Sequence, residues 1–144
     1  MEHTKITKIA ARFDHMNIDV SNLERSIEFY DKALGLKEVG HRIVAPDGSF
    51  IIVYLGEAEK EQAGKTKNTY CGFRLELTWL RAHANKTYDL GENETHLCVR
   101  VPGDYDKTRE YHRAMGCICY ENEVMGLYFI HDPDDYWIEV LPLK

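Results

Sequence analysis

The chain has 144 residues, of which 44% are hydrophobic and 29% are charged, and its formal net charge is −6. This composition is typical of one folded domain and argues against intrinsic disorder. Because the basic residues do not cluster and no run approaches 18 apolar residues, we expect neither a nucleic-acid partner nor a membrane span.

The N-terminal stretch and the cysteines bear on the compartment. The stretch MEHTKITKIAARFDHM contains no apolar signal core, so we expect a cytoplasmic protein. A cytoplasmic protein keeps its thiols reduced. The four cysteines are therefore expected to be free core or surface residues, and they are Cys71, Cys98, Cys117 and Cys119.

The first half of the chain predicts a strand, a helix and three further strands. The alternation of Met16, Ile18 and Val20 predicts the first strand. A helix follows over roughly 22–34, capped by Ser21 or Asn22 and ending before a glycine suited to a left-handed cap, Gly35. The later segments are strands at 38–45 and 49–55 around the turn 46–49, a polar loop at 56–68 and a strand at about 70–79.

The second half repeats this order. Shifting the chain by 81 positions places His15 on His96, and it also aligns Val20 with Val101, Tyr30 with Tyr111 and Gly35 with Gly116. A helix is predicted over 104–115, capped by Asp104, and strands are predicted at 117–122, 126–131 and 136–142. The expected fold is thus α+β, a single domain of paired βαβββ modules at 10–79 and 94–142, joined by the connector 80–93.

Strand parity assigns the polar residues of this repeat to one face. Side chains alternate across a strand, so His15 lies opposite the apolar face that the helix covers, and His96 does the same in the second copy. The closing strands RLELTW and WIEVLP each hold one glutamate between aliphatic residues, Glu76 and Glu139, which face the same way as the histidines. A solitary strand histidine or glutamate is usually structural, but here the pair recurs at matching positions in both copies.

Two imidazoles and two carboxylates provide what a divalent cation needs. The carboxylates balance the 2+ charge, and coordination accounts for the placement of Glu139 within a buried strand. If the two sheets join into a curved wall, His15, Glu76, His96 and Glu139 can converge on one metal. Five histidines have no matching partner and are expected at the surface; they are His3, His41, His83, His112 and His131.

The motifs DHMNIDVSNLERSIEFYDKALGLK, RLELT, YDLGENETHLCVRV and HDPDDYWIEVLP resemble those of the vicinal-oxygen-chelate proteins, and most closely glyoxalase I (lactoylglutathione lyase) of the short bacterial type. The resemblance covers about residues 10–142. It implies that His15, Glu76, His96 and Glu139 bind a divalent metal, Ni²⁺ or Co²⁺ first and Zn²⁺ or Mn²⁺ as alternatives. It also implies a homodimer with a thiol hemithioacetal as its small-molecule substrate.

The implied chemistry is a lyase reaction. A hemithioacetal of methylglyoxal and a thiol is isomerised through an enediolate to a 2-hydroxyacyl thioester, with Glu139 as the base and Glu76 as the second choice. Two alternatives stay open. One is another metal-dependent enzyme of this fold, an epimerase or thiol transferase, and the other is a resistance-type protein that binds a small ligand without chemistry.

The chain departs from the glyoxalase pattern at three positions. Asp19 stands where an arginine usually holds a glutathione carboxylate, and Leu80 stands where an asparagine is usual. Asp135 replaces the usual glycine of the final turn. The first two departures leave the identity of the thiol open. Strand parity names four candidates for the wall around the substrate, which are Tyr70, Arg74, Arg100 and Trp137.

Overall fold

The computed structural model describes residues 8–57 and 72–143, which form two modules of like construction. The first contains β1 (His15–Val20), α1 (Leu23–Leu34), β2 (Leu36–Val44), β3 (Phe50–Glu57) and β4 (Arg74–Leu80). The second contains β5 (Leu97–Val101), α3 (Tyr105–Met115), β6 (Ile118–Asn122), β7 (Leu127–His131) and β8 (Trp137–Pro142). A short 3-10 turn, Arg81–His83, begins the connector.

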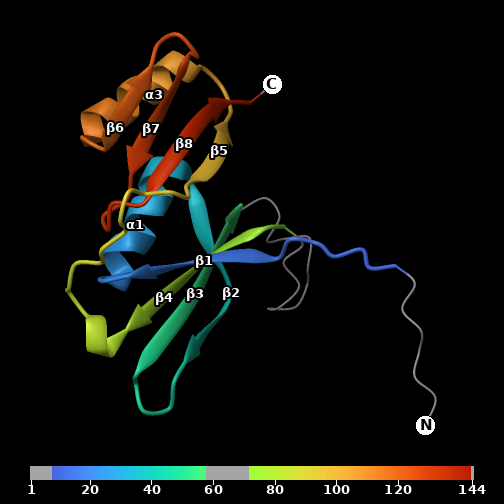
Figure 1. Cartoon of the computed structure of the whole chain (residues 1–144), viewed down its shortest axis with the longest axis vertical. Helices are drawn as coiled ribbons and strands as arrows, with labels where there is room; N and C mark the ends of the chain where they lie inside the picture. The colour runs from blue at the N-terminus through green and yellow to red at the C-terminus, as the bar shows by residue number, and fades with distance from the viewer. Residues whose placement is uncertain (1–7, 58–71, 144) are drawn as a thin grey trace.

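Each module folds into its own four-stranded sheet (Figure 1). The strand orders are β1-β4-β3-β2 and β5-β8-β7-β6, so the repeat in the sequence is a repeat in topology. In both sheets the first strand pairs in parallel with the closing strand, and the remaining pairs are antiparallel. The predicted α+β arrangement of paired βαβββ modules is therefore confirmed.

The helix ends follow the predicted cap chemistry. The side chain of Asn22 accepts a hydrogen bond from the backbone N–H of Arg25, and Asp104 accepts one from Lys107 in the same way. Gly35 and Gly116 close the helices with φ of 66° and 74°, the left-handed region that glycine enters without steric cost. Of the two caps proposed for α1, Asn22 is thus the one used.

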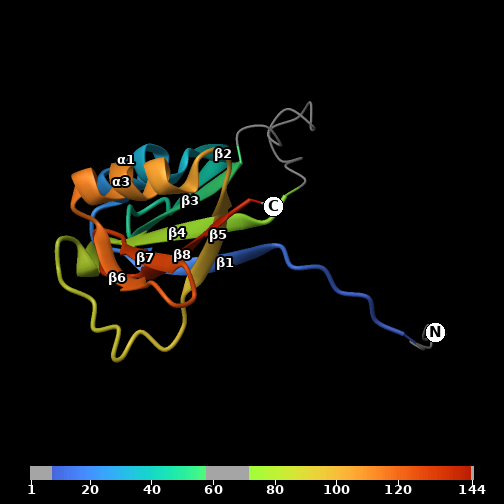
Figure 2. The ribbon, with the colours of Figure 1, turned by 90° about the horizontal axis from the view of Figure 1, so that it is seen from above.

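The two helices lie next to each other on one side of the molecule, and the sheets lie on the other (Figure 2). Tyr111 on α3 donates a hydrogen bond to the carbonyl oxygen of Lys32 on α1. His112 on α3 is completely buried and contacts the carbonyl of Ala33. The prediction that His112 lies at the surface is wrong, because packing of the second helix against the first removes this side chain from water.

The turn before β8 fastens the second module to the first. Tyr30 on α1 donates a hydrogen bond of 2.7 Å to the buried carboxyl group of Asp132. Ser21 donates one of 2.6 Å to Asp134, a residue of the same turn. The hydroxyl of Ser21, one of the two predicted helix caps, is used here instead.

Some boundaries differ from the predicted ones. The strand predicted at 70–79 is described from Arg74 to Leu80, and most of the loop predicted at 56–68, together with Tyr70 and Cys71, lies outside the described residues, as does His3. The first strand of the second module begins at Leu97, so the irregular connector continues to His96. Among the described residues no helix is long and apolar enough to cross a membrane.

Candidate metal centre

The first His–Glu pair lies on the sheet face that α1 does not cover. β1 and β4 run in parallel, with His15 opposite Arg74 and Asn17 opposite Glu76. The Nε2 atom of His15 lies 3.3 Å from an oxygen of the Glu76 carboxylate. The neighbours Leu75 and Leu77 are buried beneath the helix, which confirms the predicted alternation and leaves the pair on the open face.

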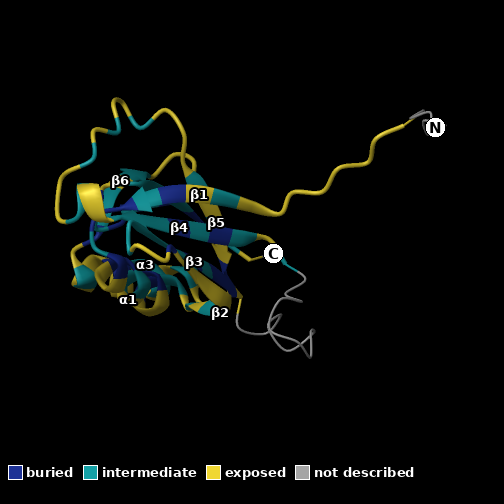
Figure 3. Ribbon diagram, turned by 90° about the horizontal axis from the view of Figure 1, so that it is seen from below, coloured by how far each residue is buried: buried dark blue, intermediate teal, exposed yellow. Residues whose placement is uncertain are grey.

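The second pair has the same geometry. His96 immediately precedes β5, and Glu139 lies on β8 with Cys98 as its partner in the parallel ladder. The distance from His96 Nε2 to the Glu139 carboxylate is 3.1 Å. Ile138 and Val140 on either side of Glu139 are fully buried. Both modules thus present one imidazole nitrogen and one carboxylate together. Figure 3 shows the burial along β1 and β4, which carry the first pair.

One chain does not bring the four residues together. Within residues 8–57 and 72–143, no three His, Cys, Asp or Glu side chains are grouped closely enough to hold a metal ion. Each module of one chain therefore presents two of the four predicted ligands, apart from the other two. The donors fit a divalent cation that prefers nitrogen and oxygen, since two neutral imidazoles and two carboxylates match its charge and ligand preferences.

Three further side chains surround the first pair. Asp14 lies with its carboxylate 2.6 Å from the Nδ1 atom of His15, and the same oxygen accepts a hydrogen bond of 2.6 Å from Arg74. These two hydrogen bonds hold the pKa of Asp14 below its usual value. The guanidinium carbon of Arg74 also lies 4.1 Å from the centre of the Tyr54 ring. Interaction with the carboxylate of Glu76, its partner across the ladder, raises the pKa of Tyr54.

The second pair lies against aromatic rings. Phe129 meets His96 edge-on with ring centroids 5.0 Å apart, and Trp137 lies 5.5 Å from Phe129. Tyr120 stacks on Trp137 at 6.2 Å. Cys98 is a free thiol on this open face, and desolvation, followed by the charge of Glu139, raises its pKa.

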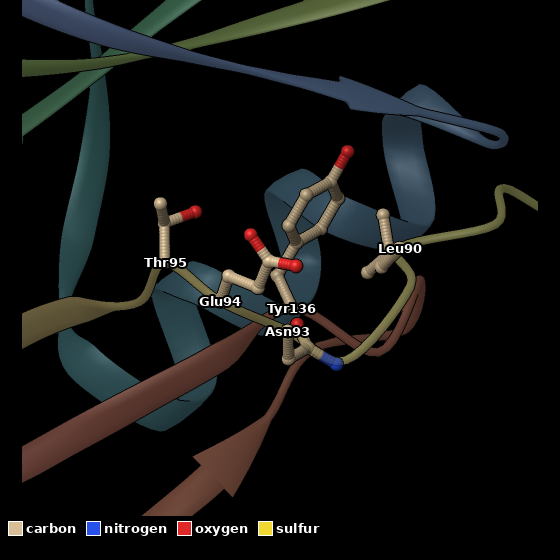
Figure 4. Close-up of a pocket in the computed structure, with 5 residues that line it drawn as sticks. All are labelled: Leu90, Asn93, Glu94, Thr95 and Tyr136. Carbon is tan, nitrogen blue, oxygen red and sulfur yellow. The ribbon is translucent and has the colours of Figure 1, made fainter.

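A separate hollow of about 330 Å³ lies between the connector and the turn that precedes β8 (Figure 4). Its lining residues are Leu90, Asn93, Glu94, Thr95 and Tyr136. The hydroxyl of Tyr136 donates a hydrogen bond of 2.9 Å to the backbone oxygen of Asp19, at the end of β1. The hollow thus lies close to the end of β1, and its lining includes one carboxylate, that of Glu94 in the connector.

Sequence reasoning missed Asp14, Tyr54 and Phe129. Tyr54 and Phe129 occupy matching positions in the two modules, since each is the ladder partner of its module's glutamate. A comparison of the two copies could therefore have found both. Of the four predicted wall residues, Arg74 and Trp137 lie beside the pairs. Arg100 is exposed on β5 and donates a hydrogen bond to the carbonyl of Pro142, and Tyr70 lies outside the described residues.

Among the described residues, the remaining histidines lie outside both pairs. His41 is exposed, His83 stacks on Tyr88, and His131 lies 3.1 Å from Asp135. Asp135 adopts φ of 71°, the left-handed conformation that a glycine would enter without strain. The described cysteines are free, as predicted, and they are Cys98, Cys117 and Cys119.

Comparison with known families agrees with this geometry. Residues 12–140 match the model of the Glyoxalase/Bleomycin resistance protein/Dioxygenase superfamily, and the chain belongs to this superfamily. Within it, the chain is 31% identical over 140 residues to lactoylglutathione lyase of Neisseria meningitidis, covering 92% of this chain and 91% of the relative. The lactoylglutathione lyase of Pseudomonas aeruginosa is 27% identical, with 90% of this chain and 81% of the relative covered. The predicted resemblance is confirmed.

Solved structures show the same likeness. The trypanothione-dependent glyoxalase I of Leishmania major superposes with a TM-score of 0.72 at 30% identity, covering 92% of this chain and 87% of that one. Glyoxalase I of maize superposes with a TM-score of 0.72 at 27% identity, and there the match spans 92% of this chain and 45% of the maize chain. The fosfomycin resistance protein FosX of Listeria monocytogenes, at 12% identity and a TM-score of 0.66, shares the fold.

Proposed function

We propose that this protein is a metal-dependent lyase of the glyoxalase I kind, which isomerises the hemithioacetal of methylglyoxal and a thiol to a 2-hydroxyacyl thioester. The observation that carries the proposal is the repeated His–Glu pair. Each module brings an imidazole nitrogen within 3.3 Å of a carboxylate on a face that no helix covers. The similarity to lactoylglutathione lyases over nine-tenths of the chain supports the same activity.

The complete ligand set would come from two chains. His15 and Glu76 of one chain would meet His96 and Glu139 of a second copy, so that a symmetric homodimer would contain two sites. The proposal rests on the separation of the two pairs within the described part of one chain. It explains why each open face presents two ligands.

The nitrogen and oxygen donors favour a six-coordinate ion, Ni²⁺ or Co²⁺, with Zn²⁺ or Mn²⁺ as alternatives. When bound, the metal supplies Lewis acidity that stabilises the negative charge of an enediolate. The residues of this chain orient the substrate and move the proton. Glu139 takes the proton from one substrate carbon and returns it to the next, and Glu76 is the second choice for this role.

The thiol partner would differ from glutathione in charge. Asp19 contributes a carboxylate where binding of a glutathione carboxylate would need a cation, and like charges disfavour each other. The side chain of Asp19 accepts a hydrogen bond only from an amide, Asn17, among the described residues. We therefore propose a thiol with a neutral or cationic tail, for which trypanothione, the thiol of the Leishmania relative, is the first candidate to test.

One experiment tests the activity. The metal is removed with a chelator, Ni²⁺, Co²⁺, Mn²⁺ or Zn²⁺ is added back, and thioester formation from methylglyoxal is followed with glutathione or trypanothione. We expect the greatest turnover with Ni²⁺ or Co²⁺, and we expect Glu139→Gln to abolish it. Stoichiometric metal binding without turnover of either thiol would exclude this lyase activity and direct the search to the epimerase or thiol-transferase alternative.

The compartment follows from the same reasoning. A thiol-dependent enzyme with free cysteines suits a reducing environment, so we propose that the protein acts in the cytoplasm. Neither nucleic acid nor a membrane has a role in this proposal.

A further inference from the structure

The histidines of the two pairs differ in what lies behind the ring. In the first module the carboxylate of Asp14 lies 2.6 Å from Nδ1 of His15, while Nε2 of the same ring faces Glu76 at 3.3 Å. Because an ionised carboxylate can only accept a hydrogen bond, the proton of a neutral His15 ring lies on Nδ1. Nε2 then keeps the lone pair that a metal ion requires of an imidazole.

Asp14 is itself held by Arg74 on the neighbouring strand. The Nη2 atom of Arg74 donates a hydrogen bond of 2.6 Å to the Asp14 carboxylate, and the backbone N–H of Arg74 donates one of 3.0 Å to the Asp14 carbonyl. The guanidinium carbon of Arg74 lies 4.1 Å from the centre of the Tyr54 ring. His15 and Arg74 are partners in the parallel ladder, so the register of β1 and β4 sets this arrangement.

The second module has no counterpart of this arrangement among the described residues. Thr95 immediately precedes His96, and Trp137 stands two residues before Glu139, so neither equivalent position carries a charge. Within the described part of the chain, His96 has a hydrogen bond through Nε2 only, to Glu139 at 3.1 Å. The first histidine is therefore the one whose Nε2 is left free by a hydrogen bond at Nδ1.

We propose that Asp14, anchored by Arg74, is a positioning residue for metal binding, which holds His15 in the tautomer and orientation that leave Nε2 free to ligate the ion. This inference rests on the proposed function, because it concerns the metal centre of the proposed lyase. A carboxylate on the second nitrogen of a ligating histidine fixes the tautomer and orientation of the ring and increases its basicity. Loss of such a partner typically lowers metal affinity by about 10- to 100-fold.

The tautomer of His15 provides the first test, in metal-free protein. Asp14→Ala removes the carboxylate, and Thr95→Ala is the matched control at the equivalent position of the second module. The Asp14 side chain is 65% exposed, so its removal leaves the core intact. With isotopically labelled histidine, NMR reports which nitrogen of each neutral imidazole holds the proton. We expect His15 to hold it on Nδ1 in the wild type and in Thr95→Ala, and to lose this preference in Asp14→Ala.

Ni²⁺ affinity, measured by competition with a chromogenic chelator, provides the second test. We expect Asp14→Ala to bind Ni²⁺ about tenfold or more weakly than the wild type, and Thr95→Ala to bind it equally well. Asp14→Asn keeps an oxygen that accepts a hydrogen bond from Nδ1, so it should bind Ni²⁺ more tightly than Asp14→Ala. Arg74→Met leaves the carboxylate without its anchor and should also weaken binding.

These measurements need no substrate, which separates this inference from the lyase proposal. An unchanged His15 tautomer or an unchanged Ni²⁺ affinity in Asp14→Ala would overturn the role of Asp14, even if the protein turns over a hemithioacetal. An equal loss of affinity in Thr95→Ala would overturn it as well, because any residue before a ligating histidine would then have the same effect. Weaker binding in Asp14→Ala alone, combined with no turnover by the wild type, would sustain the role of Asp14 and overturn the lyase proposal.

Discussion

The Nε2 atom of His112 lies 2.7 Å from the carbonyl oxygen of Ala33, across the contact between the two helices. On the opposite side of the ring, Nδ1 lies 2.8 Å from the hydroxyl of Tyr128. The Ala33 carbonyl can only accept, so Nε2 donates to it, and Nδ1 shares the second hydrogen bond with the Tyr128 hydroxyl. One buried side chain thus joins α1, α3 and β7.

Removing this side chain is expected to destabilise the protein. His112→Ala leaves the Ala33 carbonyl and the Tyr128 hydroxyl without partners and creates a cavity, so the free energy of unfolding should fall by about 3 kcal/mol. Urea denaturation measures the loss. His41→Ala, at an exposed histidine, is the matched control and should change stability by less than about 0.5 kcal/mol. Equal midpoints for the two variants would show that the buried contact contributes nothing.

Asp132 should make stability depend on pH. Desolvation raises the pKa of this buried carboxyl group from 3.8 to about 6. The carboxyl group therefore binds a proton more tightly in the folded protein than in the unfolded chain. Its contribution to the free energy of unfolding falls as the pH rises from about 4 to about 6 and is constant above that range. The size of this contribution is at most about 3 kcal/mol.

The variant Asp132→Asn isolates this effect. The difference in unfolding free energy, wild type minus variant, should decrease between about pH 4 and pH 6 and then level off. Chemical denaturation at several pH values measures it. A difference that stays flat or increases over this range would mean that the carboxyl group is not destabilised by burial.

Mixed dimers would reveal whether two chains share each metal site. Chains with His15→Ala and chains with His96→Ala should each be inactive alone. Co-expressed, they should regain roughly a quarter of wild-type activity, because half of the dimers are mixed and one of their two sites has all four ligands.

The control pairs two changes within the same module. Chains with His15→Ala co-expressed with chains carrying Glu76→Ala should stay inactive, since both sites of every dimer then lack a ligand from the first module. Restoration by this second pair, or none by the first, would contradict ligand sharing between chains.

Asp19 should control the preference for the thiol tail. Asp19→Arg replaces a negative charge with a positive one at the end of β1, so the KM of the glutathione hemithioacetal should fall by about tenfold. Steady-state kinetics with glutathione and trypanothione measures the change in preference. Glu123→Arg makes the same change in net charge at an exposed position and should leave both KM values as they were. A parallel shift in the two variants would indicate a general charge effect.

The sequence by itself determined the modules and the faces of their strands. The 81-residue repeat predicts two copies of βαβββ, and the alternation around Glu76 and Glu139 places both glutamates opposite the helix, because side chains in a strand alternate strictly. Helix caps at Asn22, Asp104, Gly35 and Gly116 depend on local backbone chemistry, which is why they could also be predicted from the chain.

Only the tertiary structure decided what lies between and behind these elements. The burial of His112 depends on the packing of α3 against α1, a contact between residues 79 positions apart that no local pattern records. Tyr54 and Arg74 were separated from His15 in the sequence, and the strand register brought them beside it. The separation of the two His–Glu pairs likewise follows from how the modules pack, since periodicity determines the face of a strand but not the distance between sheets.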